Sequence, residues 1–176
     1  MQIPSSSRNK ALVVVDVQPS FLKTRNKYVV QNILELLSKT KYDLYIEATF
    51  HAEKGSLWDI QQSWICPKGE ETRTVSEISK KLEILNAVRV EKETKSVFKG
   101  DKNVALILKD KNITEVHVVG LDTNDCVLAT AYESFDLGFV TYAIEECCES
   151  SSSKELREHA IEILRGQNMT NNSVAE

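Results

Sequence analysis

The residue with the clearest chemical potential is Cys126, which stands where a predicted strand gives way to a predicted helix. The apolar run over residues 116–119 breaks at Gly120, and a helical pattern begins near Cys126. A thiol near a helix N-terminus lies close to backbone N–H groups and the positive end of the helix dipole. These favour the thiolate and can also hold an oxyanion. The pattern therefore predicts a cysteine nucleophile at this turn.

A carboxylate is predicted at the same rim of the sheet. Residues 11–15 form a nearly continuous β-branched run that is typical of a strand buried on both faces, and the run ends in Asp16. In parallel α/β sheets the ligand crevice lies outside the carboxyl ends of the strands. We therefore expect Asp16 and Cys126 to meet there.

The elements that must position these residues alternate between strand and helix patterns. Such alternation predicts a three-layer α/β/α sandwich of Rossmann-like type, with a central and mainly parallel sheet. Residues 49–73 contain Gly55 and Pro67 and are interpreted as a long irregular insertion that shapes a pocket. Strands are expected near residues 11–16, 44–48, 87–90, 116–119 and 139–144, and helices near residues 28–39, 74–82, 102–111, 125–136 and 151–164.

The length of 176 residues and the 41% hydrophobic content predict one globular domain. We place it over residues 10–166, with a flexible N-terminus over residues 1–9 and a disordered tail over residues 167–176. The 22 basic and 26 acidic residues are interspersed and form no basic stripe, which argues against a nucleic-acid partner.

The same composition predicts a cytoplasmic protein. No run approaches the roughly 20 apolar residues of a membrane span, and the polar first ten residues lack the apolar core of a signal peptide. The four cysteines have neither the paired spacing of a zinc site nor the density of a secreted disulfide scaffold. We expect no membrane partner and a reducing compartment.

Three segments together resemble the isochorismatase-like cysteine hydrolase family, which includes nicotinamidases and carbamoyl amidohydrolases. Residues 14–21 read VVDVQPSF and are similar to the family's Asp-x-Gln-x-x-Phe strand end. Residues 92–98 read KETKSVF and are similar to its Lys-x-x-x-Ser-x-Phe segment. Residues 119–127 read VGLDTNDCV and look like its nucleophile turn. The resemblance covers about residues 11–165 and implies the family's α/β fold.

This resemblance implies a catalytic triad of Asp16, Lys92 and Cys126. Asp16 would accept the thiol proton, and Lys92 would favour the thiolate and hold Asp16 in place. A small amide, carbamoyl or related substrate would then form a thioester on Cys126. Lys95 and Lys99 lie in the same charged segment, and Lys95 is the first alternative to Lys92.

The resemblance also implies an oxyanion hole made by the backbone N–H groups of Asp122 and Cys126, with a cis peptide bond before Asp122. It implies a small-molecule substrate as the partner and a homo-oligomer, either a dimer or a tetramer, and we expect no cofactor. Asp122 is unusual because an acid beside an oxyanion donor adds negative charge. Its side chain is expected either to point away or to bind a cationic substrate group.

The chain departs from the nicotinamidases of the family after the second predicted strand. Residues 47–58 contain His51 but no second histidine at ligand spacing, so we expect no catalytic metal and place the chain in a metal-free branch. Candidates for substrate contact are Gln18, Phe21, Trp58 and Trp64. Local backbone bonding for Gln18 and core packing for the aromatic residues are the alternatives.

Two other classes of function stay open. The fold can serve as a catalytically silent binding module, because fold does not determine function. A thiol redox protein would instead need Cys147 or Cys148 to approach Cys126 in space.

Overall fold

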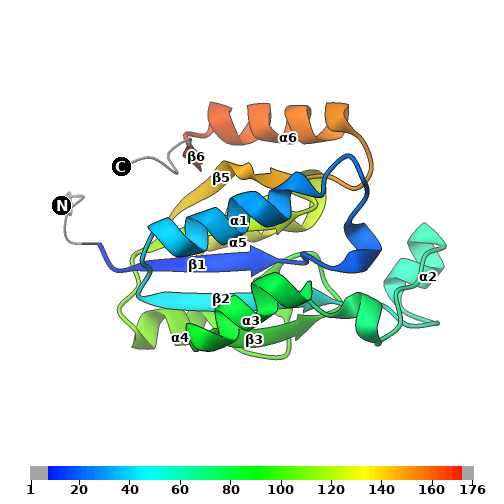
Figure 1. The fold of residues 1–176 in the computed structure, drawn as a ribbon, viewed down its shortest axis with the longest axis horizontal. Coiled ribbons are helices and arrows are strands. Elements are labelled where there is room, and N and C mark those ends of the chain that lie inside the picture. The colour runs from blue at the N-terminus through cyan, green and yellow to red at the C-terminus, as the bar shows by residue number, and fades with distance from the viewer. Residues whose placement is uncertain (1–7, 172–176) are drawn as a thin grey trace.

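The structure is a computed structural model and describes residues 8–171. Its centre is a six-stranded sheet in which all pairs of neighbouring strands are parallel (Figure 1). The order across the sheet is β3-β2-β1-β4-β5-β6. The strands are β1 (Lys10–Val15), β2 (Leu44–Phe50), β3 (Val88–Lys92), β4 (Glu115–Leu121), β5 (Val140–Glu149) and β6 (Thr170–Asn171).

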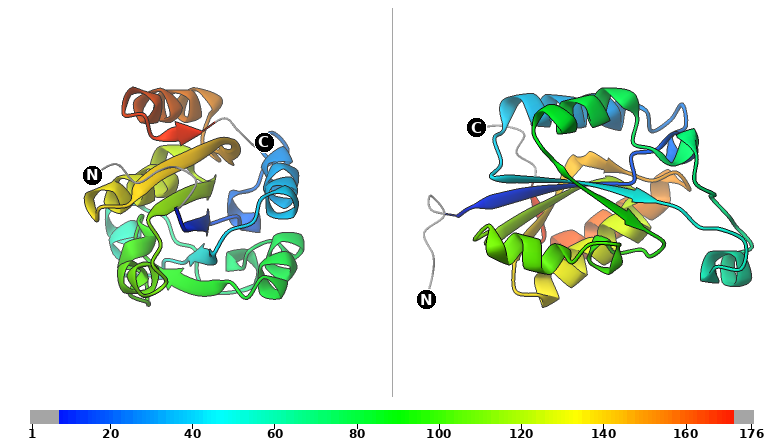
Figure 2. Two further views of the ribbon diagram at one scale, coloured as in Figure 1. Left: turned by 90° about the vertical axis from the view of Figure 1, so that its left-hand side faces the viewer. Right: turned by 90° about the horizontal axis from the view of Figure 1, so that it is seen from below.

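Helices cover both faces of this sheet, which confirms the predicted three-layer fold (Figure 2). The helices α1 (Tyr28–Lys39) and α3 (Ser76–Ile84) pack on one face. The other face carries α4 (Val104–Asp110), α5 (Leu128–Asp136) and α6 (Lys154–Gly166). The short helix α2 (Leu57–Gln62) projects beyond the carboxyl ends of the strands (Figure 1).

The pattern of α1 shows how the sequence specifies a layer. Its residues Val29, Ile33, Leu36 and Leu37 are buried, and their spacing places them on one side of the helix. This apolar stripe packs against the sheet face on which Leu12 and other core residues lie. The predicted helix over residues 28–39 is confirmed.

The strands β1 and β4 form the middle of the sheet and are buried on both faces. Residues 11–15 are each at most 1% exposed, and successive side chains enter opposite core clusters. The register pairs Val15 with Gly120, so the carboxyl ends of the two strands are adjacent. The two predicted reactive segments therefore begin side by side.

Gly120 allows this close approach. Its φ is +121°, and a Cβ atom at this position would lie 2.0 Å from the carbonyl oxygen of Val15. Only glycine combines this backbone conformation with this contact. The glycine that breaks the predicted strand is thus a packing requirement of the β1–β4 pair.

The expected domain boundaries need correction at both ends. Met169 is 3% exposed, and Thr170 and Asn171 pair with β5, so residues 167–171 belong to the fold and are not a disordered tail. Arg8 forms an ion pair with Glu115 at 3.0 Å, so the fold begins before residue 10. The polar composition of these segments has no apolar period, and their order comes from tertiary contacts. Residues 1–7 and 172–176 lie outside the described part.

The insertion over residues 49–73 is more regular than expected. It contains α2, whose N-cap residue Ser56 accepts a hydrogen bond from the backbone N–H of Asp59, and a 3₁₀ turn at Glu70–Thr72. The last predicted strand also continues past residue 144, since β5 runs to Glu149. Within residues 8–171, no helix is both long enough and apolar enough to cross a bilayer.

Candidate active site

The structure brings Asp16 and Lys92 into contact at the carboxyl end of the sheet. Asp16 directly follows β1 with a left-handed φ of 51°, and Lys92 is the last residue of β3. Lys92 Nζ donates a hydrogen bond to Asp16 Oδ2 at 2.6 Å, and both side chains are fully buried. Lys92 also donates to the carbonyl of Thr94 at 3.0 Å. Because β2 lies between β1 and β3, only a long side chain can make this contact.

The two rival lysines take other partners. Lys95 pairs with Asp125, and its Nζ lies 4.6 Å from the ring centroid of Trp58. Lys99 pairs with Glu133 at 2.9 Å. Both ammonium-bearing side chains are more than half exposed, at 52% and 65%. The structure therefore singles out Lys92 as the partner of Asp16.

Cys126 lies in a π-helical turn, Thr123–Val127, that precedes α5. The carbonyl of Asp122 accepts hydrogen bonds from the N–H groups of Asp125 at 3.0 Å and Val127 at 3.1 Å, which close this turn. The peptide bond between Leu121 and Asp122 is cis. Cys126 is 7% exposed and lines the same cavity as Asp16.

This cavity has a volume of about 300 Å³ and one aromatic wall. The wall consists of Phe21, Phe50, Trp58 and Trp64, and all four residues line the cavity. The ring centroid of Phe50 lies 4.9 Å from that of Trp58 and 5.7 Å from that of Trp64. Phe21, Trp58 and Trp64 thus occupy positions from which a substrate can be contacted. Phe50, the last residue of β2, is a lining residue that the sequence analysis missed, because it was assigned to the irregular insertion over residues 49–73.

Gln18 is the predicted substrate-contact residue that the structure places elsewhere. It is fully buried and does not line the cavity. Its Nε2 donates to the carbonyl of Phe50 at 2.9 Å, and its Oε1 accepts from the N–H of Phe50 at 2.6 Å. Gln18 therefore fastens the end of β2 to the segment after β1, which is the backbone-bonding alternative.

Asp122 lines the cavity, but its carboxylate is held by the segment that follows β5. Oδ1 accepts from the N–H of Ser151 at 2.8 Å, and Oδ2 accepts from the hydroxyl of the same residue at 2.5 Å. A second link joins Ser150 Oγ and Asn124 Oδ1 at 2.6 Å. Burial raises the pKa of Asp122. These contacts anchor the turn that contains Cys126 to the β5–α6 connection, a role that was not predicted.

The electrostatics of Cys126 differ from the expectation drawn from the helix dipole. Burial raises the pKa of the Cys126 thiol well above its usual value, and the negative charges of Asp16 and Asp125 act in the same direction. The positive charge of Lys92 lowers the pKa but does not outweigh them. The raised pKa favours the thiol form of Cys126, so an attack by its sulfur would need a base to take the proton.

Asp16 and Lys92 form a charged pair that can supply this base. Burial raises the pKa of Asp16, and the charge of Lys92 opposes this shift. Burial acts to lower the pKa of Lys92, but the charges of Asp16 and Cys126 and the hydrogen bonds to both side chains together outweigh it, so the pKa of Lys92 is raised. The second carboxylate oxygen, Asp16 Oδ1, is buried and has no hydrogen-bond partner among residues 8–171. It is an acceptor available for a proton.

Cys147 and Cys148, the two cysteines of the redox alternative, lie in the core of the sheet. All four cysteines are free. Cys147 belongs to the core on the α1 side of the sheet, whereas Cys126 belongs to the core on the opposite side. Cys148 is fully buried with its sulfur 3.6 Å from the carbonyl of Val118, and burial raises its pKa to about 12. Neither Cys147 nor Cys148 lines the cavity with Cys126.

The donor set around His51 does not fit a metal ion. His51 Nε2 lies 3.1 Å from Glu93 Oε1. The residue two positions before the histidine is Thr49, which has no carboxylate or imidazole to offer a metal. Within the described residues, no group of three or more His, Cys, Asp or Glu side chains is arranged to hold a metal.

Comparison with known proteins identifies relatives of this chain. The family model described as the isochorismatase domain matches residues 10–174. The Bacillus subtilis (strain 168) protein described as the uncharacterized isochorismatase family protein YrdC is 32% identical over 146 residues, which are 78% of this chain and 72% of that protein.

Solved structures share the fold at lower identity. The pyrazinamidase of Pyrococcus horikoshii, solved in complex with zinc, superposes with a TM-score of 0.76 at 20% identity and covers 93% of this chain and 97% of its own. The nicotinamidase PncA of Bacillus subtilis gives 0.75 at 20% identity, with 89% and 94% covered. The yeast nicotinamidase Pnc1p gives 0.76 at 18% identity, with 93% and 100% covered.

Proposed function

This chain belongs to the isochorismatase family, and we propose that it is a cysteine hydrolase that cleaves the C–N bond of a small amide or carbamoyl compound. One observation carries the proposal. The buried Lys92–Asp16 pair, 2.6 Å long, adjoins a cavity that Asp16 and Cys126 both line. A base, a cation and a nucleophile around one cavity are the groups that acyl transfer needs.

The first half of the reaction forms a thioester. Asp16 Oδ1 accepts the proton of the Cys126 thiol while the sulfur attacks the substrate carbonyl carbon. Lys92 keeps the carboxylate ionised and oriented. The backbone N–H groups of Asp122 and Cys126 donate to the oxyanion of the tetrahedral intermediate. The C–N bond then breaks, and the proton held by Asp16 passes to the leaving nitrogen.

The second half of the reaction releases the acid. A water molecule takes the place of the departed amine, and Asp16 removes its proton as the oxygen attacks the thioester carbon. The C–S bond breaks, and the proton returns to the sulfur of Cys126. The sum is an amide plus water giving a carboxylic acid and an amine or ammonia, with the enzyme unchanged.

The cavity favours a small substrate with a flat apolar body. A volume of about 300 Å³ lies at the lower end of ordinary ligand pockets. The aromatic wall can pack against a ring or a short apolar group. The names of the structural relatives, pyrazinamidase and nicotinamidase, favour the amide class. Assembly into a dimer or tetramer, predicted from the family resemblance, remains a proposal as well.

A hydrolysis screen tests the function. Small amides, carbamoyl compounds, ureides and vinyl ethers are incubated with the wild-type chain, with Cys126→Ala and with Cys147→Ala, which removes a cysteine away from the cavity. We expect wild-type and Cys147→Ala to release ammonia or amine and Cys126→Ala to release none. Turnover that survives Cys126→Ala would refute the mechanism. Saturable binding of a compound without turnover would favour the silent binding module instead.

A further inference from the structure

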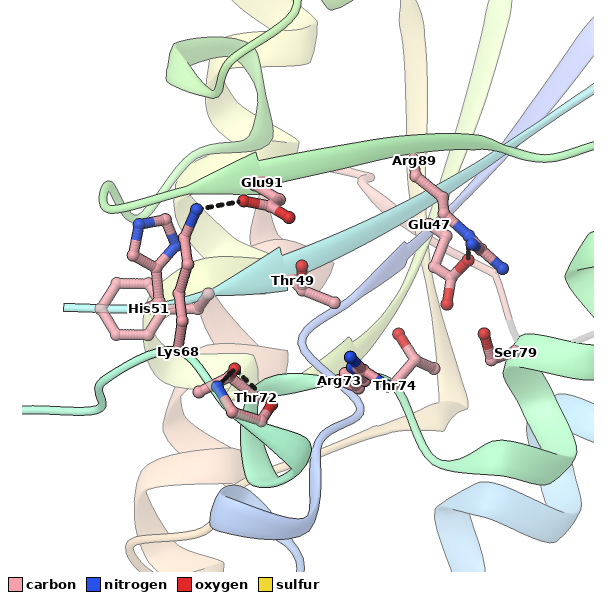
Figure 3. A pocket seen from close by; sticks show the side chains of 12 residues that line it. Glu47, Thr49, His51, Lys68, Thr72, Arg73, Thr74, Ser79, Arg89 and Glu91 are labelled. Atoms are coloured by element: carbon pink, nitrogen blue, oxygen red, sulfur yellow. Dashed lines mark hydrogen bonds and ion pairs between the residues drawn. The ribbon is translucent and has the colours of Figure 1, made fainter.

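A second and larger cavity lies on the α3 side of the sheet, beside the ends of β2 and β3 (Figure 3). Its volume is about 570 Å³. Glu47 and Thr49 of β2, Arg89 and Glu91 of β3, and the segment over residues 72–74 line it. It shares only Phe50 with the lining of the catalytic cavity. We refer to it as the polar cavity.

Strand alternation explains why this part of the sheet is polar. In β2, Ile46 and Ala48 enter the core on the α4 side, so Glu47 and Thr49 face the other side. In β3, Val90 and the buried Lys92 alternate with Arg89 and Glu91 in the same way. The helix α3 begins only at Ser76. The loop before it covers this end of the sheet without filling it with apolar side chains.

Thr74 brings to the polar cavity a hydroxyl group whose hydrogen-bonding capacity is unsatisfied among the described residues. The residue is 6% exposed, and its Oγ1 is buried with no hydrogen-bond partner among the described residues. Figure 3 shows the Thr74 side chain directed toward Glu47 and Arg89, with the Ser79 hydroxyl facing the same space. A buried hydroxyl without a partner is unfavourable unless a bound molecule supplies one. This hydroxyl therefore points to an occupant with hydrogen-bonding atoms.

The lining of the polar cavity carries one more basic than acidic side chain, His51 aside, although each of its three basic groups has a carboxylate partner, and Arg89 also lies 3.9 Å from Glu83. Glu91 pairs with Lys68 at 2.6 Å, and Glu47 pairs with Arg89 Nε at 3.0 Å. Arg73 is the remaining charged side chain of the lining, His51 aside. It pairs with Glu70, which does not line the cavity. Both side chains of that pair are more than 70% exposed, so water screens it strongly. The lining as a whole favours a negative ligand.

We propose that the polar cavity is a binding site for a small molecule that carries a carboxylate or a phosphate. The guanidinium groups of Arg73 and Arg89 bind its oxygens, a task that suits their planar set of donors. The hydroxyl groups of Thr74 and Ser79 supply neutral hydrogen bonds deeper in the cavity. Glu47 stays paired with Arg89, and this positive charge offsets the repulsion between the Glu47 carboxylate and a bound anion.

The site is distinct from the catalytic cavity but connected to it by two strands. Thr49 precedes Phe50 in β2, and Glu91 precedes Lys92 in β3. In each pair the first residue lines the polar cavity, while the second belongs to the proposed catalytic region. A ligand in the polar cavity thus contacts the neighbours of two residues that shape the reaction site.

An NMR titration of the full ¹⁵N-labelled chain tests this proposal. Inorganic phosphate and succinate are added separately at constant ionic strength, with sodium chloride as the balancing salt. We expect saturable shifts of the backbone amides over residues 72–79 with at least one of the two anions. A response to phosphate alone assigns phosphate, and a response to succinate alone assigns a carboxylate.

Matched variants separate a built site from general attraction. Arg73→Gln is expected to weaken binding at least tenfold, and Thr74→Val is expected to weaken it severalfold while keeping the shape of the side chain. Lys109→Gln also removes one positive charge, but on α4 at the opposite face of the sheet, and should leave binding unchanged. The proposal is overturned if neither anion gives saturable shifts, or if Lys109→Gln weakens binding as much as Arg73→Gln. These binding results do not depend on turnover, so they stand apart from the proposed hydrolase function.

Discussion

Buried charges occur at both ends of the central strands, and the two groups are built differently. At the amino end, Glu115 of β4 contacts Arg8 at 3.0 Å and His117 at 2.8 Å, and His117 contacts Tyr42 at 2.9 Å. At the carboxyl end, one carboxylate oxygen of Asp16 accepts from Lys92, and the other has no hydrogen-bond partner among residues 8–171. Of these two clusters, only the one at the carboxyl end adjoins the cavity that Cys126 lines.

The pKa shifts of the two acids have opposite directions for this reason. Burial opposes the ionisation of Glu115, but hydrogen bonds from His117 and Arg8 outweigh it and lower the pKa to about 2. Burial raises the pKa of Asp16, and one lysine does not cancel the effect. Burial of a charge alone is therefore a poor sign of catalysis. An incompletely satisfied acid on a cavity is the better sign.

Replacement of the two acids should separate these roles most strongly. Asp16→Asn removes the proposed base and is expected to lower kcat/KM by about a thousandfold or more, because a positioned general base is typically worth 10²–10⁴. Glu115→Gln should leave kcat/KM within about twofold. The measurement is steady-state hydrolysis of the best substrate from the screen. Equal losses in both variants would show that the amino-end cluster also serves catalysis.

The close approach of β1 and β4 gives a second contrast, between Gly120 and Gly138. Gly120→Ala places a Cβ atom 2.0 Å from the carbonyl oxygen of Val15, and the strand ends must separate. We expect a loss of about 3 kcal/mol or more in the free energy of unfolding, at the upper end of single substitutions.

Gly138→Ala is the matched control at the turn after α5. Gly138 also has a positive φ, +92°, but its Cβ would have no atom within 4 Å. The loss should be about 1 kcal/mol, from backbone strain alone. Urea denaturation followed by circular dichroism measures both variants. Similar losses would contradict the role assigned to the Val15 contact.

The charge of Lys92 should be visible in the pH profile. The proposed mechanism needs ionised Asp16, so activity should be lost as the pH falls through the pKa of this acid. Lys92→Met removes the cation that lowers this pKa, so the acid limb of kcat/KM is expected to move to higher pH by about 1 unit or more. Residual activity is followed with high enzyme concentration. An acid limb that stays in place would mean that Lys92 does not set the ionisation of Asp16.

The substitution Glu115→Gln at the amino end should have a smaller effect, and on stability alone. The pKa of Glu115 is lowered in the fold, so its ionised form stabilises the protein above the usual pKa of 4.5, and this contribution is lost as the pH falls toward 2. Glu115→Gln should therefore be less stable than wild-type near neutral pH, and the difference should shrink below pH 4.5. Urea midpoints across this range measure it. A difference that is independent of pH would contradict the assigned ionisation.

Much of the fold could be predicted because local patterns agree with it. The apolar stripe of α1 and the buried run of β1 gave the right elements, and the family resemblance drawn from three motifs is confirmed. The two ends of the domain were placed wrongly. Residues 167–171 have no apolar period of their own, and β6 forms only because β5 offers an unpaired edge.

The candidate site was predicted unevenly. Asp16 and Cys126 stand at strand ends, which local patterns can locate. The resemblance of residues 92–98 to the family segment selected Lys92 over Lys95 and Lys99, and the sheet order explains why its ammonium group is the one that reaches Asp16. The protonation state of Cys126 was also beyond a local argument, because burial depends on residues distant in the chain.

By itself, the sequence determined which residue types stand at the strand ends, because alternation and apolar periods are local properties of the chain. Only the tertiary structure decided which of these residues meet, which are buried and which keep an unused hydrogen-bonding atom. The contact of Asp16 with Lys92, the anchoring of Asp122 by Ser151 and the unpartnered hydroxyl of Thr74 all depend on segments distant in sequence. Such contacts arise from strand order and packing, which no local pattern contains.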